Sequence, residues 1–472
     1  MSAAGIQAGA GGARPGLGRN YWKVFTASLC TNLGDGLMSV AVVWLASSLT
    51  REATLIALVG LASRLPWLLF SLPAGVITDR YDRRLLVAFM DIARLVVIGA
   101  LGVGVLLHQS GLPTPEELAA GAEPPDTAGL LLGLLCVASL LIGFAEVVRD
   151  NAAQTLMPSV VDKAQLEKAN GRLWGAEMTM NSFVGPPLGG VVIAVALALP
   201  FFVNVGMLAV SVALLLALTG NFMPKGQTTS GRINWRREIG EGFRWLWDHH
   251  LLRALAVLLG AMNMLSSMVF ILIVLFAQEI LGLFEGWQFG LVLTGTAAGA
   301  VLGSLLADRV AQRLTPGTAL FVAIIGSGAV TAAMGLLSWA PAFWAVGVVG
   351  GFFMVLWNVI TVSLRQRIIP DHLLGRVNSV YRFFGWGTIS VGTLLGGVLV
   401  SLGEPLLGRE WALRTPFLLA GAVHLLLLAF ALPRINTARI AAATAAAEQA
   451  EARQGRAGVD PQEADLPGPL GS

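Results

Sequence analysis

Two ionisable residues stand in the middle of long apolar stretches, where a charge could handle protons. Asp35 occurs in Asn32-Leu33-Gly34-Asp35-Gly36, and Arg64 occurs in the apolar stretch 54–78. A charged residue at the centre of a membrane span costs about 2.5–3.5 kcal/mol on insertion scales, so each charge needs a reason. One hypothesis is that Asp35 takes up and releases a proton while Arg64 tunes its proton affinity. The alternative is a static Asp35–Arg64 pair that holds two helices together.

A second group of ionisable residues follows helical spacing. Asp91 and Arg94 are three residues apart, as are Glu146 and Arg149, so each pair shares one helix face. Glu177 lies ~9 Å into the next apolar stretch and has no matched base. These residues predict a network around a gate or, alternatively, structural ion pairs, and Glu177 stays a candidate proton or substrate site. The candidates for proton coupling are therefore Asp35, Arg64, Glu146 and Glu177.

Several chemistries find no residues to support them. No G-x-x-x-x-G-K-[ST] loop for ATP phosphates occurs, and the five histidines are scattered, so we expect no ATP hydrolysis, no metal site and no cofactor. Nothing resembles a nucleophile–base pair, so we do not expect an enzyme. A membrane carrier without ATP chemistry must draw on an ion or substrate gradient.

The composition shows what positions these residues. The chain of 472 residues is 55% hydrophobic and only 12% charged, about half the charged share of a soluble protein. Repeated apolar runs of 18 or more residues predict a polytopic membrane protein, and their length selects helices. We predict twelve spans, at 22–49, 54–78, 85–107, 128–149, 171–198, 201–221, 252–278, 287–307, 317–339, 341–364, 377–402 and 412–432.

Positive charge is distributed by side of the membrane. With twelve spans, all but five of the 31 lysines and arginines fall on the side of the two termini; Arg51, Arg409 and Arg414 lie opposite, and Arg64 and Arg94 lie inside spans. We expect a plasma-membrane protein, and this asymmetry predicts that both of its termini lie in the cytoplasm. Because the positive charge follows the membrane topology, the basic composition does not indicate nucleic-acid binding. Cys30 and Cys136 fall in apolar runs and imply no disulfide framework.

The segments outside the spans have distinct compositions. The outer loop 109–127 is rich in proline and acidic residues, and we expect no stable structure there. The inner loop 223–250 interleaves arginine with tryptophan, which predicts a helix lying on the inner leaflet. The tail is expected to be disordered beyond its first turns. The predicted parts are an arm (1–21), a six-helix bundle (22–221), a linker (222–251), a second bundle (252–432) and the tail (433–472).

Two motifs occur in both halves of the chain and indicate a duplication. The charged turn Gly75–Arg84 returns, degraded, as Ser304–Arg313. The run Gly185-Pro186-Pro187-Leu188-Gly189-Gly190 has a counterpart in Gly392–Gly397, and its glycines permit close helix approach. We expect packing rather than direct ligand contact from Gly185, Pro186, Gly189 and Gly190.

The second half is poorer in buried charge. Its polar residues within spans include Asn263, Ser266, Ser267 and Asn358. Substrate is therefore expected to meet a large apolar cavity with few fixed polar groups. The candidate cavity residues are Asn32, Met38, Asn263, Ser267, Phe353, Trp357 and Asn358.

The charged turn resembles the loop signature of the major facilitator superfamily, and Gly185-Pro186-x-x-Gly189 resembles its antiporter motif. Asp82 stands where that signature usually has glycine. The segments Leu65–Arg94 and Ile369–Asn378 are similar to the branch of macrolide efflux proteins and enterobactin exporters. The resemblance implies an all-α fold of twelve helices in two pseudo-symmetric six-helix bundles with alternating access. Taken with the repeated charged turn and the charged pairs within spans, it predicts a conformational gate of Gly75, Asp79, Arg80, Arg83, Arg84, Asp91, Arg94, Arg149, Asp308 and Arg309.

The resemblance also assigns roles to single residues. It implies that Asp79 and Arg80 latch the bundles in the outward-open state, and that Asp35, Glu146, Asn263 and Asn358 face the cavity or its inner mouth. The resulting prediction is a monomeric, proton-driven exporter of amphipathic small molecules in contact with membrane lipid. The alternatives are a siderophore exporter, a lysophospholipid or other lipid carrier, and a non-transporting membrane sensor.

Overall fold

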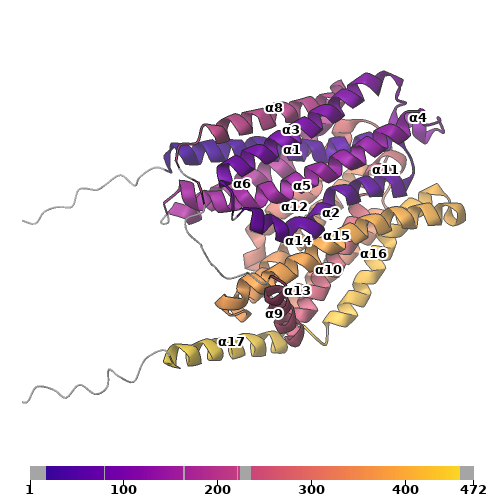
Figure 1. Cartoon of the computed structure of the whole chain (residues 1–472). Helices are drawn as coiled ribbons and strands as arrows, with labels where there is room; N and C mark the ends of the chain where they lie inside the picture. The colour runs from indigo at the N-terminus through magenta and orange to yellow at the C-terminus, as the bar shows by residue number, and fades with distance from the viewer. Residues whose placement is uncertain (1–16, 79, 163–164, 221, 224–234, 458–472) are drawn as a thin grey trace, which may run out of the picture.

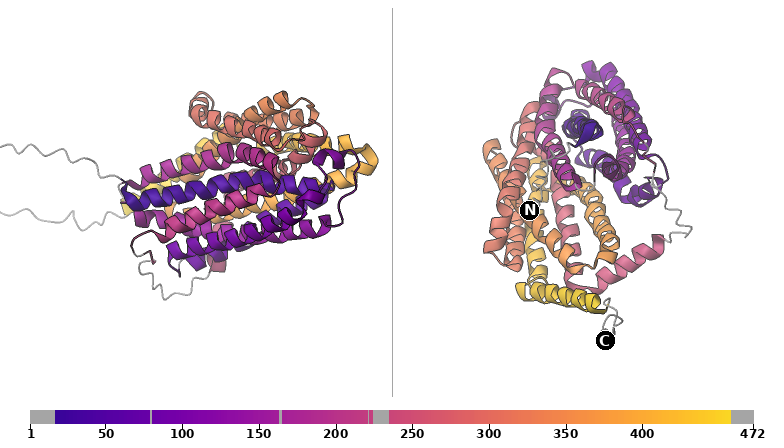
Figure 2. Two further views of the ribbon diagram at one scale, coloured as in Figure 1. Left: turned by 90° about the horizontal axis from the view of Figure 1, so that it is seen from above. Right: turned by 90° about the vertical axis from the view of Figure 1, so that its left-hand side faces the viewer.

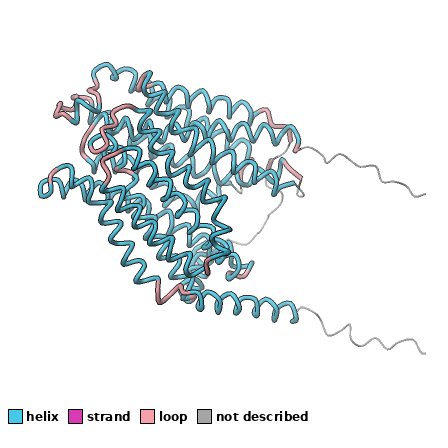
Figure 3. Tube along the Cα trace, turned by 180° about the vertical axis from the view of Figure 1, so that it is seen from behind, coloured by secondary structure: helices cyan, strands magenta, loops and turns pink. Residues whose placement is uncertain are grey.

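The computed structural model describes residues 17–78, 80–162, 165–220, 222–223 and 235–457. These residues form helices joined by loops and contain no strand (Figure 3). Twelve helical segments are long and apolar enough to cross a membrane, which confirms the predicted fold class. The helices gather in two groups, one from each half of the chain, that lie side by side (Figure 1).

The first half contributes six spans. Seen end-on, α1 is surrounded by the other helices of this half (Figure 2, right). The bounds are α1 Gly18–Leu49, α2 Ala53–Thr78, α3 Arg83–His108, α5 Ala128–Val160, a fifth span built from α6 Leu166–Met178, η3 Thr179–Val184 and α7 Gly185–Val195, and α8 Leu199–Leu216.

The second half repeats this plan. Its first span is interrupted after Phe270, and its fifth is the longest helix in the described part of the chain. The bounds are α10 His250–Phe270 with α11 Ile273–Glu279, α12 Gly286–Arg313, α13 Pro316–Leu336, α14 Ala340–Ile368, α15 Asp371–Leu407 and α16 Arg409–Ala431.

The fifth span changes its winding at the glycine–proline motif. Residues Thr179–Val184 form a π-helical turn directly before Gly185 and Pro186. A proline has no N–H for the helix ladder and its ring crowds the preceding turn, so the wider turn relieves that conflict.

The motif glycines bring helices into backbone contact in both halves. A Cβ on Gly185 or Gly189 would meet the backbone of α1, and one on Gly190 would meet Gly286 of α12 in the other half. On α15, Gly396 lies in the same way against α10, and Gly397 lies against α2 across the halves. The duplicated motif therefore packs each fifth span against the first span of its own half and against one helix of the other half.

The outer loop contains regular structure that the sequence-based expectation did not include. Two short helices, η1 Gln109–Gly111 and α4 Pro115–Ala119, form there, and Thr114 and Glu117 make a capping box. The hydrogen bond from the backbone of Thr114 holds the pKa of Glu117 below its usual range. The pattern Thr-x-x-Glu was the overlooked signal.

The tail is also more ordered than predicted. It forms α17, Thr437–Ala457, whose alanine-rich sequence favours a helix. Ile440 is buried in the core of the second half, and Thr437 bonds to Thr315 at 2.7 Å. In the linker, the predicted helix is α9, Trp235–Asp248, and its Leu246 is buried in the same core.

Candidate functional site

A cavity of about 1290 Å³ lies between the two halves. Residues of α1, α2, α5 and the fifth span line one wall, and residues of α10, α13, α14 and α15 line the other. The halves spread apart at the end that holds the start of α1 and α17, and they meet at the opposite end near α4 and α11 (Figure 1).

Arg94 is the centre of a charged network in the wall of the first half. Its side chain is only 1% exposed, and its guanidinium pairs with Asp35 of α1, with Glu146 of α5 at 3.4 Å and with Asp91 of its own helix at 3.8 Å. Three carboxylates therefore share one arginine. Asp35 and Glu146 also line the cavity, so the network reaches the space between the halves.

A second arginine extends the network. Arg149 of α5 lies 3.3 Å from Asp91 and 3.0 Å from Asp150, and it donates to Thr31 of α1 at 2.7 Å. Asp91 is fully buried and accepts a further hydrogen bond from Ser211 of α8 at 2.8 Å. Side chains of α1, α3, α5 and α8 are thus connected through ionisable groups.

The geometry corrects two predicted pairings. Asp35 pairs with Arg94, not with Arg64. Glu146 and Arg149 share a helix face as expected, yet each finds its partner on α3 rather than in the other. Spacing along one helix indicates only which residues share a face. In a tight bundle a long arginine side chain reaches the carboxylates of neighbouring helices, which sequence spacing does not reveal.

Two further predicted residues line the cavity without joining that network. Arg64 of α2 is exposed to the cavity. Glu177 of the fifth span accepts a hydrogen bond from Ser28 of α1.

The candidate cavity residues divide by half. Asn32 and Met38 of α1 and Asn263 and Ser267 of α10 line the cavity. The three residues predicted on α14 are not among its lining residues: Phe353, Trp357 and Asn358.

The rotation of α14 about its axis explains why these three residues do not line the cavity. Gly347, Gly350 and Met354, at three- and four-residue spacing, are the α14 residues that line the cavity. Phe353 packs beside the core of the second half, and Trp357 is buried within it. Asn358 bonds to the carbonyl of Met354.

The charged turn ties helices of the first half together. Arg83 donates to the carbonyl of Thr155 at 2.9 Å, and Arg84 donates to the carbonyl of Leu218 at 2.8 Å. Arg80 is exposed. Asp79 lies outside the described residues, and for Gly75 only the position in α2 is described. In the degraded copy Arg309 is exposed on α12, and only the helical position of Asp308 is described.

Sequence reasoning missed a second charged cluster, where the halves meet. Glu279 of α11 binds Arg409 of α16 through both oxygens, at 2.7 and 2.9 Å, and pairs with Arg51 from the first half at 3.6 Å. Gln278 donates to Ser47 of α1 at 3.0 Å. Glutamate and glutamine at the end of an apolar run, opposite loop arginines, were the available signal.

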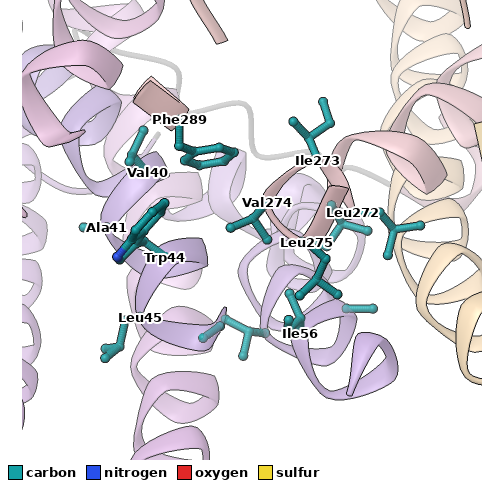
Figure 4. Packing of buried hydrophobic residues seen from close by; sticks show 14 of the residues in the cluster. Val40, Ala41, Trp44, Leu45, Ile56, Leu272, Ile273, Val274, Leu275 and Phe289 are labelled. Atoms are coloured by element: carbon teal, nitrogen blue, oxygen red, sulfur yellow. The ribbon is translucent and has the colours of Figure 1, made fainter. Parts of the chain in front are cut away.

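Apolar side chains close the same end of the cavity. Val40 and Trp44 of α1 lie toward Val274 of α11 and Phe289 of α12 (Figure 4). The rings of Trp44 and Phe289 lie 5.9 Å apart. The cavity is therefore sealed at this end by apolar packing and, beyond it, by the ion pairs of Glu279.

Comparison with known proteins agrees with this architecture. The family model described as transmembrane secretion effector matches residues 17–459. The multidrug efflux pump Tap of Mycolicibacterium fortuitum is 26% identical and covers 86% of this chain and 94% of its own. The enterobactin exporter EntS of Citrobacter koseri is 24% identical and covers 80% of this chain and 85% of its own.

Solved structures share the fold at low identity. A bacterial homologue of the iron transporter ferroportin, in an inward-facing state, superposes with a TM-score of 0.65 at 17% identity, covering 87% of this chain and 98% of its own. The nucleoside transporter NupG gives 0.62 at 11% identity, with 88% and 100% covered. The family consists of transporters rather than enzymes. The chain belongs to the transmembrane secretion effector family of the major facilitator superfamily and is a multi-pass membrane transporter of the efflux type.

Proposed function

We propose that this transporter exports amphipathic small molecules across the plasma membrane in exchange for protons. The observation that carries the proposal is the excess of carboxylates around Arg94 at the cavity wall. Relatives named as a multidrug efflux pump and an enterobactin exporter support export of small molecules.

The charge balance of the network favours a proton site. Four carboxylates, those of Asp35, Asp91, Glu146 and Asp150, share the two arginines Arg94 and Arg149. Unpaired negative charge in a low-dielectric wall is costly, and a proton on a carboxylate removes it. Asp91 is fully buried, whereas Asp35 and Glu146 line the cavity and can exchange protons with water there.

Alternating access then couples the two flows. We infer that both termini are cytoplasmic, so the structure represents the inward-open state, closed outside by the cluster at Glu279. Protonation of Asp35 or Glu146 weakens its pairing with Arg94 and loosens α1 or α5 from α3. Opening the outer side requires Arg51 and Ser47 of the first half to leave Glu279 and Gln278 of the second. Asp79 and Arg80 would then latch the inner side.

The cavity also suggests the substrate class. Its second-half wall carries Phe270, Met334 and Met354 beside hydroxyl and amide groups, and it suits a bulky, largely apolar molecule. A siderophore remains the alternative that the EntS relative favours. A lysophospholipid or other lipid is a further alternative, and a non-transporting sensor is the most remote one, because a sensor has no need of a buried carboxylate network.

Transport in energised inside-out vesicles tests the proposal. We would follow proton release with a pH-sensitive dye and accumulation of a fluorescent amphipathic dye, comparing wild type with Asp35→Asn and Glu146→Gln. Glu123→Gln, in the exposed outer loop, is the matched control. We expect a protonophore and at least one network variant to abolish accumulation, and the control to leave it unchanged. Accumulation that survives the protonophore in wild type would contradict proton coupling.

A further inference from the structure

Arg64 is an exposed cation on the cavity wall. Both other arginines that line the cavity, Arg94 and Arg149, are held by carboxylates. Within the described part of the chain, Arg64 makes no hydrogen bond and no ion pair, although its charge interacts at longer range with Glu146. An arginine in the middle of a span is costly and marks a functional site unless a structural partner explains it.

A second unsatisfied donor lies one turn along the same helix. Trp67 follows Arg64 by three residues and also lines the cavity, and its indole Nε1 is buried without a hydrogen-bond partner. Its ring stacks on Trp386 of α15, with centroids 5.0 Å apart and an interplanar angle of 17°. An indole and a guanidinium can only donate hydrogen bonds. Arg64 and Trp67 therefore offer donors and positive charge; Ser63, on the same face, donates its hydroxyl to the carbonyl of Gly60 at 2.8 Å and adds no charge.

The complementary ligand group accepts hydrogen bonds and carries negative charge. We propose that Arg64 and Trp67 bind the anionic head of an amphipathic ligand, a carboxylate, phosphate, sulfonate or catecholate, inside the cavity. The apolar body of that ligand lies against Trp386 and the second-half wall, where Phe270 and Met354 are exposed. A planar guanidinium suits such groups because it donates two parallel hydrogen bonds. This inference rests on the proposed function only in taking the cavity as the substrate site.

Two sources could supply the same chemistry. One is a free organic anion that the protein exports, and the other is the headgroup of an anionic lipid that enters the cavity from the membrane. Both predict the same contacts to Arg64 and Trp67. One measurement must therefore test whether the site binds anions, and a second must test whether the anion is a lipid headgroup or a free organic anion.

A pair of fluorescent probes of nearly identical shape tests the site. The first is 1-anilinonaphthalene-8-sulfonate, whose charge does not vary with pH, and the second is N-phenyl-1-naphthylamine, which lacks the sulfonate. Affinities are measured on the purified full chain in an uncharged detergent without any ion gradient. We expect the sulfonate to bind wild type about tenfold or more tightly than the neutral probe, as hydrogen bonds to a charged group predict.

Substitutions then assign the preference to residues. Arg64→Gln should lower the affinity for the sulfonate probe about tenfold and change the affinity for the neutral probe less than twofold. Trp67→Phe keeps an aromatic ring but removes the N–H donor, so it should lower the affinity for the sulfonate probe a few-fold. Arg64→Lys keeps the charge and should fall between wild type and Arg64→Gln, which covers the case in which the glutamine variant does not fold. Arg439→Gln, exposed on α17, is the control and should change neither probe.

The outcomes separate this inference from the proposed function. Equal affinity of wild type for the two probes, or equal weakening of both by Arg64→Gln, would overturn the anion site. Competition by phosphatidylglycerol micelles with the sulfonate in wild type would support the site and identify lipid as its source, and competition only by soluble aromatic carboxylates would support it with a free anion. Because no gradient is used, failed proton coupling in vesicles would leave these affinities untouched, and a failed anion site would leave coupling intact.

Discussion

The two walls of the cavity share an architecture but not a chemistry. In both halves the fifth span packs through equivalent glycines, Gly190 against α12 and Gly397 against α2. Among the described residues, every charged side chain that lines the cavity comes from the first half, whereas the second half contributes neutral polar, aliphatic, methionine and aromatic side chains. The two halves thus share this packing, whereas charge at the cavity wall is confined to the first. The difference suggests a division of labour, with proton handling in the first wall and apolar substrate contact in the second.

Removing the central charge of the first wall should have the largest effect. Arg94→Gln leaves Asp35, Asp91 and Glu146 without the guanidinium that they share, and breaking a buried ion pair costs about 3–5 kcal/mol. We expect a much lower thermal unfolding midpoint in detergent and little transport. The control variant Arg439→Gln, at an exposed site, should change the free energy of unfolding by no more than about 0.5 kcal/mol. A midpoint for Arg94→Gln that matches this control would show that the first wall does not depend on its charges.

Opening the outer cluster should rank second. Glu279→Gln weakens the pair with Arg51 of the first half. It also weakens two charge-assisted hydrogen bonds that position Arg409, which itself donates to the carbonyl of Arg51 at 2.8 Å. The free energy of the outward-open state relative to the inward-open state should therefore fall by about 2 kcal/mol. Distances between spin labels at Ala122 and Leu406, introduced after replacing Cys30 and Cys136, report the separation of the halves.

Glu404→Gln is the matched control for the outer cluster. Glu404 pairs with the same Arg409 at 2.9 Å but is 41% exposed, so its loss should shift the label distances far less. Equal shifts in the two variants would mean that the ion pairs do not hold the outer side closed.

Alanine at either of the equivalent glycines, Gly190 or Gly397, should rank third and reduce transport by a similar factor. A Cβ on Gly190 or on Gly397 would lie under 3 Å from backbone of the other half, so either alanine variant must separate the halves slightly. We expect about a tenfold loss of transport in each, near 1.4 kcal/mol. Gly133→Ala, with nothing within 4 Å of the added carbon, should be tolerated. A loss for only one of the two glycines would show that packing, like charge, has become asymmetric.

The fold could be predicted from the sequence because its signals are local or repeated. Apolar runs of span length give the twelve helices, and the repeated glycine motif gives the relation between the halves. The outer-loop helix was missed although its capping pattern Thr114-x-x-Glu117 is local, because acidic and proline-rich composition was given more weight.

The sequence identified several residues of the site but not which of them pair with one another. Asp35, Glu146 and Glu177 were identified because an ionisable group in a span needs an explanation, and all three line the cavity. Their partners could not be identified, because an arginine side chain selects among carboxylates on several adjacent helices. On α14 the type of residue suggested Phe353 and Trp357, but the rotation of the helix places Gly350 and Met354 at the cavity instead.

A matched pair of asparagines should give the smallest effect and the sharpest comparison. Asn32 of α1 and Asn263 of α10 both line the cavity, and each donates to a backbone carbonyl at 3.0 Å. A neutral hydrogen bond contributes about 1 kcal/mol, so Asn263→Ala should change the apparent affinity for substrate up to about fivefold and leave its pH dependence unchanged.

Asn32 also lies 3.4 Å from the hydroxyl of Ser28, which donates to Glu177. Asn32→Ala should therefore shift the pH profile of transport as well. Transport measured across pH in both variants decides the point, because identical profiles would mean that the first wall does not handle protons separately from the second.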